Sequence, residues 1–215
     1  MEKRPVELKV LIISVGSVLL VEASLRAIAY PSMLLLTGAR FVETVLILFI
    51  SRIFGRGLSD FGLGRSAFLS GLKQGFLWAC AFGVLAALLL GLLLMLGHDP
   101  LALIRTRLPL GKGDLILFFL TGVLVSPAAE EIFFRGILYG YFRRWGVAPA
   151  LALSTLAFIA AHFPGRGIPL TQAVGGLVFA ISYEKEKNLL VPFTIHSLGN
   201  LAIFALSLLP TLAHA

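Results

Sequence analysis

The sequence predicts an all-α protein that crosses a lipid bilayer several times. Hydrophobic residues make up 58% of its 215 residues, and only 13% are charged. The mean hydropathy of +0.96 is well above that of a soluble domain. Apolar runs recur along the whole chain, and several reach the roughly 20 helical residues that a hydrocarbon core requires. We therefore expect one integral membrane domain, 1–215, folded as a polytopic bundle of about seven to eight transmembrane helices.

Apolar periodicity and length place seven helical spans along the chain. Their expected ranges are 8–29, 33–53, 68–97, 114–143, 148–163, 168–182 and 189–209. The fourth is too long for one straight crossing and contains Pro127, which predicts a break into two helical pieces and an eighth segment. Because Ser126 is a favoured N-cap and Pro127 a favoured first helical residue, such a restart would place Glu130 near the first turn.

The first span resembles a signal peptide, since basic residues precede it and Ala27–Ala29 imitates a small-residue cleavage site. Glu22 and Arg26, which lie between the apolar run and that site, argue against cleavage. We therefore expect a retained span. In the third span, Gly83, Ala87 and Gly91 follow one another at intervals of four residues, so they share one helix face. Small residues on one face predict close packing against a neighbouring helix.

Basic residues predict the orientation of the bundle. With a cytoplasmic N-terminus, one side carries eleven of them: Lys3, Arg4, Lys9, Arg52, Arg56, Arg65, Lys73, Arg143, Arg144, Lys185 and Lys187. The opposite side carries four: Arg105, Arg107, Lys112 and Arg166. The positive-inside rule therefore predicts a cytoplasmic N-terminus.

Charge and cysteine content exclude several classes of function. The formal net charge is +7, but the basic residues fall in short loops, where lipid head groups explain them and no nucleic-acid partner is expected. The single cysteine, Cys80, excludes a disulfide framework and a cysteine-rich metal cluster.

Charged residues inside the spans are costly, so each requires a partner or a role. Glu22 and Arg26 are four residues apart, and Arg40 and Glu43 are three apart, so we expect two ion pairs, each on one helix face.

The stretch SPAAEEIFFRG, residues 126–136, differs from those pairs. Glu131 and Arg135 are four residues apart and can pair along a helix. Glu130 lies about 100° round the helix from Glu131, so it has no local counter-charge.

Two further polar pairs lie in later spans. Phe158 and His162 are four residues apart, as are His196 and Asn200, so each pair shares a helix face. One intramembrane histidine alone is more often structural, but together with an unpaired glutamate these residues suggest a hydrolytic site. Glu130 would act as a general base toward water, His162 would orient that water, and His196 and Asn200 would donate to the oxyanion.

On the predicted topology, these residues would lie at different depths in the membrane. Glu130 and His196 fall in the cytoplasmic halves of their spans, whereas His162 falls near the outer end of its span. A tilted or recessed helix, or irregular backbone at Pro127, would bring them together.

Other intramembrane hydrolases fit less well. The sequence has no H-E-x-x-H zinc motif and no G-x-S-x-G elbow. Gly111–Asp114 reads as the G-x-G-D of aspartyl proteases, but the other aspartates, Asp60 and Asp99, are both expected in loops. Aspartyl chemistry needs two carboxylates at one site.

Three motifs in order, E-E-x-x-x-R at 130–135, F-x-x-x-H at 158–162 and H-x-x-x-N at 196–200, resemble the CPBP family of intramembrane endopeptidases, which comprises CAAX proteases and bacteriocin-processing (Abi) proteins. The resemblance covers a core of four spans, 114–210, and leaves 1–113 as generic helices. It implies catalytic roles for four residues: Glu130, His162, His196 and Asn200. Supporting residues would be Glu131, Arg135 and Phe158.

The resemblance also implies a glutamate mechanism that needs no cofactor, although two glutamates and two histidines could bind zinc. It implies a membrane-associated protein or peptide substrate and, for so compact a chain, the cytoplasmic membrane of a prokaryote. Two alternatives remain: a non-catalytic immunity or scaffold protein that retains the polar network, and a small transporter that uses Glu130 as a proton carrier.

Overall fold

The computed structural model describes residues 6–54, 57–163 and 169–213, and within them the chain is helical, without a β-strand. The α-helices are α1 Leu8–Arg26, α2 Met33–Ile53, α3 Phe68–Met95, α4 Lys112–Leu120, α5 Ser126–Glu131, α6 Gly140–Phe142, α7 Val147–Ala161, α8 Leu170–Glu186 and α9 Leu190–Ala213. The short 3₁₀ segments are η1 Leu58–Phe61, η2 Arg65–Ala67, η3 Pro100–Leu103 and η6 Arg143–Trp145. Two π-helical segments are η4 Thr121–Val125 and η5 Ile132–Tyr139. Four of the residues used to predict orientation lie outside the described residues: Lys3, Arg4, Arg56 and Arg166.

Each of the seven expected spans corresponds to helix, so the prediction of an all-α polytopic bundle is confirmed. Five helical stretches are long and apolar enough to cross a membrane: Leu8–Arg26, Met33–Ile53, Leu58–Met95, Lys112–Trp145 and Leu190–Leu209. A sixth apolar helix, Val147–Ala161, is shorter. Helix α3 exposes many large apolar side chains, as a lipid-facing helix does, among them Leu85, Leu88, Leu89 and Leu92. The protein is an integral membrane protein.

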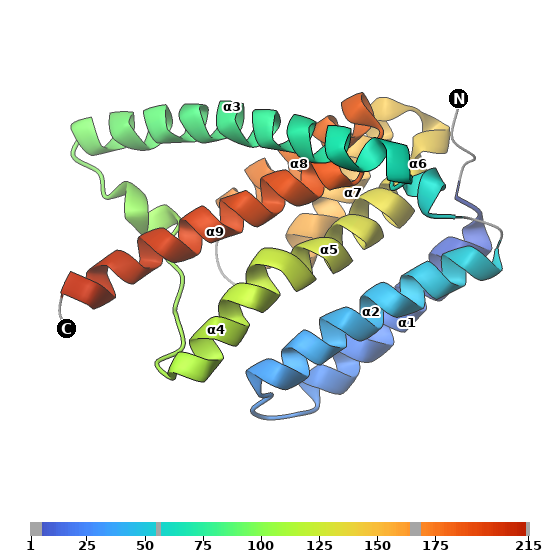
Figure 1. The fold of residues 1–215 in the computed structure, drawn as a ribbon, viewed down its shortest axis with the longest axis horizontal. Helices are drawn as coiled ribbons and strands as arrows, with labels where there is room; N and C mark the ends of the chain where they lie inside the picture. Colours follow the sequence, from blue (N-terminus) through green and yellow to red (C-terminus); the bar gives the residue numbers. More distant parts are fainter. Residues whose placement is uncertain (1–5, 55–56, 164–168, 214–215) are drawn as a thin grey trace.

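The helices surround two central elements. Figure 1 shows the α1–α2 hairpin along one side, α3 along the opposite side, and α9 and the helical run from α4 to η6 between them. Helix α9 packs against α3, α8 and α5, and α2 packs against α5. Residues that point inward from α5, α7, α8 and α9 can therefore meet.

Close packing of α3 against α9 depends on glycines at its first turns. A Cβ atom on Gly71 would come within 2.5 Å of Asn188 Nδ2, and one on Gly75 within 2.6 Å of Thr194 Cβ. The predicted stripe of Gly83 and Gly91 was wrong, because a Cβ at either position meets nothing within 4 Å. The two helices diverge beyond their first turns (Figure 1).

The predicted break at Pro127 is also wrong, since the chain stays helical from Lys112 to Trp145. Pro127 has no N–H to donate, and a π-helical turn immediately before it lets the helix continue. In this turn the Ser126 N–H bonds to the Thr121 carbonyl. Ser126 is already helical and follows the helical residue Val125, so Glu130 lies within a continuous helical run rather than at a new helix start.

Candidate active site

A fully buried ion pair anchors the inner face of η5. Arg135 Nε lies 3.1 Å from Glu131 Oε2, and Arg135 Nη1 donates to Glu131 Oε1 at 3.1 Å. The exposed fractions of these side chains are 0% and 1%. Arg135 Nη2 donates to the Gly176 carbonyl of α8 at 2.9 Å. The predicted pairing of these residues is confirmed, and the arginine also ties η5 to α8.

The same carboxylate orients His196 of α9. His196 Nδ1 lies 2.9 Å from Glu131 Oε1, and because an ionised carboxylate only accepts hydrogen bonds, Nδ1 carries the proton. The ring of Phe179 stacks on the imidazole, with centroids 4.6 Å apart and planes 19° apart. The opposite nitrogen, Nε2, therefore faces Glu130 at 3.8 Å from its Oε2.

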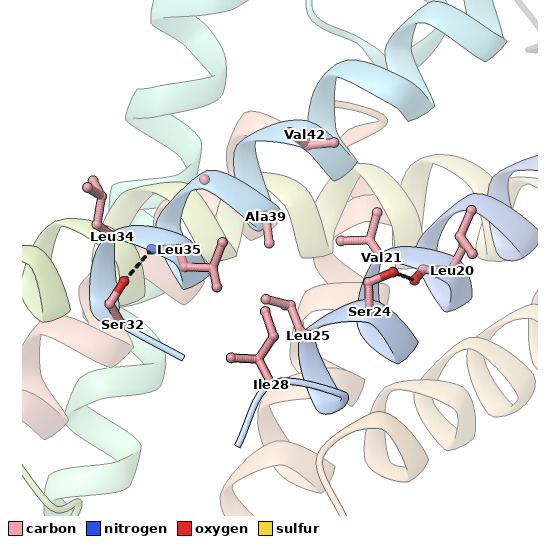
Figure 2. Close-up of a pocket in the computed structure, with 11 residues that line it drawn as sticks. Leu20, Val21, Ser24, Leu25, Ile28, Ser32, Leu34, Leu35, Ala39 and Val42 are labelled. Carbon is pink, nitrogen blue, oxygen red and sulfur yellow. Dashed lines mark hydrogen bonds between the residues drawn. The ribbon is translucent and has the colours of Figure 1, made fainter. Parts of the chain in front are cut away.

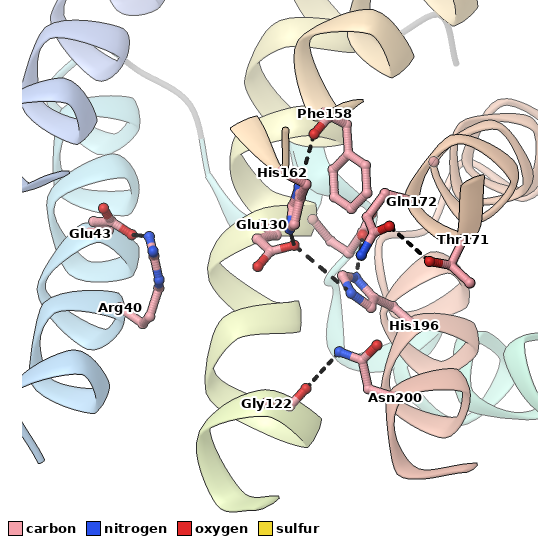
Figure 3. A network of polar contacts seen from close by, with 12 residues as sticks. Arg40, Glu43, Gly122, Glu130, Phe158, His162, Thr171, Gln172, His196 and Asn200 are labelled. Atoms are coloured by element: carbon pink, nitrogen blue, oxygen red, sulfur yellow. Dashed lines mark hydrogen bonds and ion pairs between the residues drawn. The ribbon is translucent and has the colours of Figure 1, made fainter. Parts of the chain in front are cut away.

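Glu130 lies between two imidazoles, as Figure 3 shows. Its Oε2 is 3.6 Å from His162 Nε2 and 3.8 Å from His196 Nε2. This oxygen is buried and has no hydrogen bond. Among the described residues no Lys or Arg forms an ion pair with Glu130. The prediction that Glu130 lacks the salt bridge of its neighbour is confirmed.

His162 reaches Glu130 from the end of a short helix. It is the C-cap residue of α7, which has only 15 residues. Its Nδ1 lies 2.9 Å from the Phe158 carbonyl, which can only accept, so Nδ1 carries the proton and Nε2 presents a lone pair to Glu130. The Phe158 ring packs on the imidazole with centroids 4.4 Å apart. The mismatch in depth expected from the sequence does not keep the two residues apart.

Asn200 lies one turn beyond His196 and bonds to the backbone. Its Nδ2 donates to the Gly122 carbonyl at 2.7 Å. That carbonyl has lost both helical donors: the Ser126 N–H bonds to Thr121 instead, and Pro127, one residue further, has no N–H. The structure thus brings Glu130, His162 and His196 together and places the Asn200 amide on a backbone acceptor beside them (Figure 3).

Several residues that shape the site were not predicted. Gly176 and Phe179 contact Arg135 and His196 respectively, and both lie on α8. Gln172 lies four residues before Gly176, and Figure 3 draws it among the polar residues around the site. Their spacing of four and three residues marks one helix face and was visible in the sequence, but none of the three belongs to a recognised motif.

A second ionic cluster lies on the N-terminal hairpin. Arg40 Nη1 contacts Glu22 Oε1 at 2.5 Å and Glu43 Oε2 at 2.6 Å. The predicted pair of Arg40 and Glu43 is confirmed, but Glu22 pairs with Arg40 across the hairpin rather than with Arg26. The packing of α1 on α2 places Arg40 closer than the cation on its own helix. Figure 3 shows Arg40 and Glu43 on α2, opposite Glu130.

Two further observations bear on ligands. Among the described residues, no group of three or more His, Cys, Asp or Glu side chains has an arrangement that could hold a metal ion. A groove of about 860 Å³ opens between α1 and α2, and no histidine lines it (Figure 2). Residues such as Leu20, Leu25 and Leu35 line it, and it holds no titratable side chain, so it does not supply hydrolytic chemistry.

The fold and this cluster define a polytopic helical membrane protein with a buried Glu/His/Arg site. Residues 112–202 match the family described as "Type II CAAX prenyl endopeptidase Rce1-like". The resemblance to the CPBP family is thereby confirmed.

Two curated proteins are similar to the chain. One is an uncharacterized 24.3 kDa protein of Escherichia coli, 32% identical over 126 residues, which covers 55% of this chain and 56% of that protein. The other is the membrane-embedded CAAX protease MroQ of Staphylococcus aureus strain USA300, 28% identical over 109 residues, or 47% of this chain and 41% of MroQ. The matched regions thus span about half the length of these relatives. No solved structure matches the chain.

Proposed function

We propose that the protein is an intramembrane endopeptidase that hydrolyses a peptide bond in a membrane-associated protein or peptide. The observation that carries this proposal is Glu130 Oε2, a buried carboxylate oxygen without a hydrogen bond that faces two histidine Nε2 atoms at 3.6 and 3.8 Å. Buried polar atoms without partners are rare and call for an explanation. The match of residues 112–202 to a family of endopeptidases supports the same conclusion.

Glu130 and His162 present two acceptors to one water molecule. Separations above 3.5 Å between polar groups are suited to a bridging water. That water would donate one hydrogen to the Glu130 carboxylate and the other to His162 Nε2. Glu130 then removes a proton while the water oxygen bonds to the carbonyl carbon of the substrate, and the carbonyl π electrons move to its oxygen.

His196 would stabilise the resulting oxyanion. Since Nδ1 donates to Glu131, a second proton on Nε2 makes the ring an imidazolium that can donate to the oxyanion.

The tetrahedral intermediate collapses when the oxyanion re-forms the carbonyl and the C–N bond breaks. The proton held by Glu130 passes to the departing amine, so the carboxylate returns to its starting state. One water is consumed, and one carboxyl and one amine terminus are produced.

The test is a comparison of the termini of membrane proteins from cells that make the native chain or Glu130→Gln. We expect new termini with the native chain that disappear with the variant, while the variant still inserts and accumulates. Identical termini in the two cell lines would contradict the protease function and favour the immunity or scaffold alternative. Proton-driven flux that depends on Glu130 would favour the transporter.

Zinc needs a separate test, because the sequence leaves it open. A cleaved membrane protein found by that comparison is incubated with the purified enzyme, with and without a chelator. A glutamate mechanism predicts an unchanged rate, whereas loss of cleavage that zinc restores would establish a metal-dependent one.

A further inference from the structure

The π-helical turn η4 leaves one backbone carbonyl without a helical partner. In an α-helical register the Gly122 carbonyl would accept from the Ser126 N–H, but that N–H bonds to the Thr121 carbonyl. In a π-helical register the donor would be residue 127, which is a fully buried proline and has no N–H. Pro127 thus keeps the Gly122 carbonyl free of a backbone donor.

Helix α9 supplies the missing donor. Asn200 Nδ2 donates to the Gly122 carbonyl at 2.7 Å (Figure 3). Because a carbonyl only accepts hydrogen bonds, this contact fixes which end of the Asn200 amide is the nitrogen. That nitrogen has two N–H donors and Gly122 takes one, so the other stays available for the oxyanion. His196, one turn earlier on the same face of α9, is the expected second donor.

Contacts from two helices hold η4 in place. On α2, Thr37 Oγ1 lies 2.5 Å from Oγ1 of Thr121, which is buried. On α9, the Phe204 ring lies so close to Gly122 that an added Cβ would come within 2.5 Å of its Cε2 atom. A glycine at this position therefore lets α9 approach the turn, and Asn200 lies one helical turn before Phe204. π-Helical turns are rare and are frequent at functional sites.

We propose that Pro127 is a positioning residue for the oxyanion donor: because it has no N–H, it reserves the Gly122 carbonyl for the Asn200 amide. This inference rests on the proposed function. An N–H at position 127 would give that carbonyl a backbone donor, either from residue 127 itself or from Ser126 once the turn relaxes to the α-helical register. The Asn200 amide would then lose the acceptor that orients it, and the oxyanion would lose a positioned donor.

The experiment measures the kinetics of cleavage of a membrane protein identified from the termini comparison. Pro127→Ala restores an N–H, and we expect kcat to fall about 10²-fold with little change in KM, as for a misplaced catalytic group. Asn200→Ala removes the donor itself and should lower kcat about 10²-fold to 10³-fold.

Pro149→Ala is the matched control. Pro149 lies in the first turn of α7, where a backbone N–H has no intrahelical acceptor. The same substitution there adds an N–H without disturbing a carbonyl of the site, so this variant should cleave at the native rate.

Thermal unfolding and a double variant separate this role from a structural one. A proline inside a helix costs stability, so Pro127→Ala should unfold no lower than the native chain although it cleaves more slowly. If Pro127 acts through the Asn200 hydrogen bond, combining Pro127→Ala with Asn200→Ala should give a kcat no lower than that of Asn200→Ala alone.

Three results, each with Glu130→Gln inactive, would overturn the role of Pro127 and leave the proposed function standing. They are a native kcat in Pro127→Ala, an unfolding temperature of that variant below the native one, and a further loss of about 10²-fold when it is added to Asn200→Ala. Absence of Glu130-dependent cleavage by the native chain would overturn both the role of Pro127 and the proposed function.

Discussion

Two glutamate–arginine clusters inside this bundle differ in how completely their charges are enclosed. Glu131 and Arg135 are at most 1% exposed, and they contact each other, the Gly176 carbonyl of α8 and His196 of α9. In the cluster on α1 and α2, by contrast, Arg40 and Glu22 are each 27% exposed. One arginine there contacts two carboxylates, those of Glu22 and Glu43.

The difference shows what each cluster does. The enclosed cluster fixes the orientation of an imidazole, because the oxygen that accepts from Arg135 Nη1 also accepts from His196. The partly exposed cluster links two neighbouring helices, α1 and α2, through one arginine. Only the first couples directly to the residues that would perform chemistry. Replacing its members should therefore have larger consequences.

Arg135→Met should have the largest effect on stability. It leaves Glu131 buried without its cation, and loss of one partner of a buried pair costs about 3–5 kcal/mol. We expect strongly reduced folded yield and a lower unfolding temperature in detergent. Arg107→Met, at an exposed loop position, is the control. Equal stability of Arg135→Met and the control would show that Glu131 does not depend on its arginine.

Arg40→Met should have an intermediate effect. Arg40 and Glu22 are each 27% exposed rather than enclosed by the bundle, so we expect a smaller cost of about 1–2 kcal/mol for the two unpaired carboxylates. The unfolding temperature should fall by less than for Arg135→Met, and Glu130-dependent cleavage should persist. A fall as large as that of Arg135→Met would contradict the ranking of the two clusters.

A third cluster, at the ends of η5 and α8, should have the smallest effect and one that depends on pH. Partial burial alone would raise the pKa of the Glu184 carboxyl, but hydrogen bonds from Arg143, Lys187 and Tyr139 outweigh it and lower the pKa from 4.5 to about 2. A carboxyl whose pKa is depressed by folding stabilises the protein above the unfolded pKa. This contribution is therefore complete above about pH 4.5 and lost as the pH falls toward 2.

Glu184→Gln tests that dependence. Unfolding temperatures measured from pH 5 down to pH 2.5 should fall less steeply in the variant than in the native chain. Parallel pH curves would show that the Glu184 contacts contribute nothing to stability.

The helices and the Glu131–Arg135 pair could be predicted from the sequence, because both depend on residues close together in the chain. Apolar length fixes a span, and a separation of four residues predicts the Glu131–Arg135 pair. That Glu130 has no such partner follows from the same helical geometry.

Features that depend on contacts between helices were not predictable in the same way. A π-helical turn before Pro127 is present in place of the expected break. It leaves the Gly122 carbonyl without a helical donor, and Asn200 Nδ2 on α9 donates to that carbonyl instead. The partner of Glu22 is on the neighbouring helix rather than its own. Phe179 belongs to no motif, and only the packing of α8 beside α9 brings it against His196.

The most direct test of this account is thermal unfolding of two adjacent isosteric variants, Glu130→Gln and Glu131→Gln. Glu131→Gln leaves Arg135 buried without a counter-charge, so its unfolding temperature should fall by roughly 6–20 °C, from about 3–5 kcal/mol at about 2–4 °C per kcal/mol. Glu130→Gln should unfold at or above the native temperature, because it removes the charge of a carboxylate whose Oε2 is buried without a hydrogen bond. Equal falls in the two variants would contradict the division between a reacting and a structural glutamate.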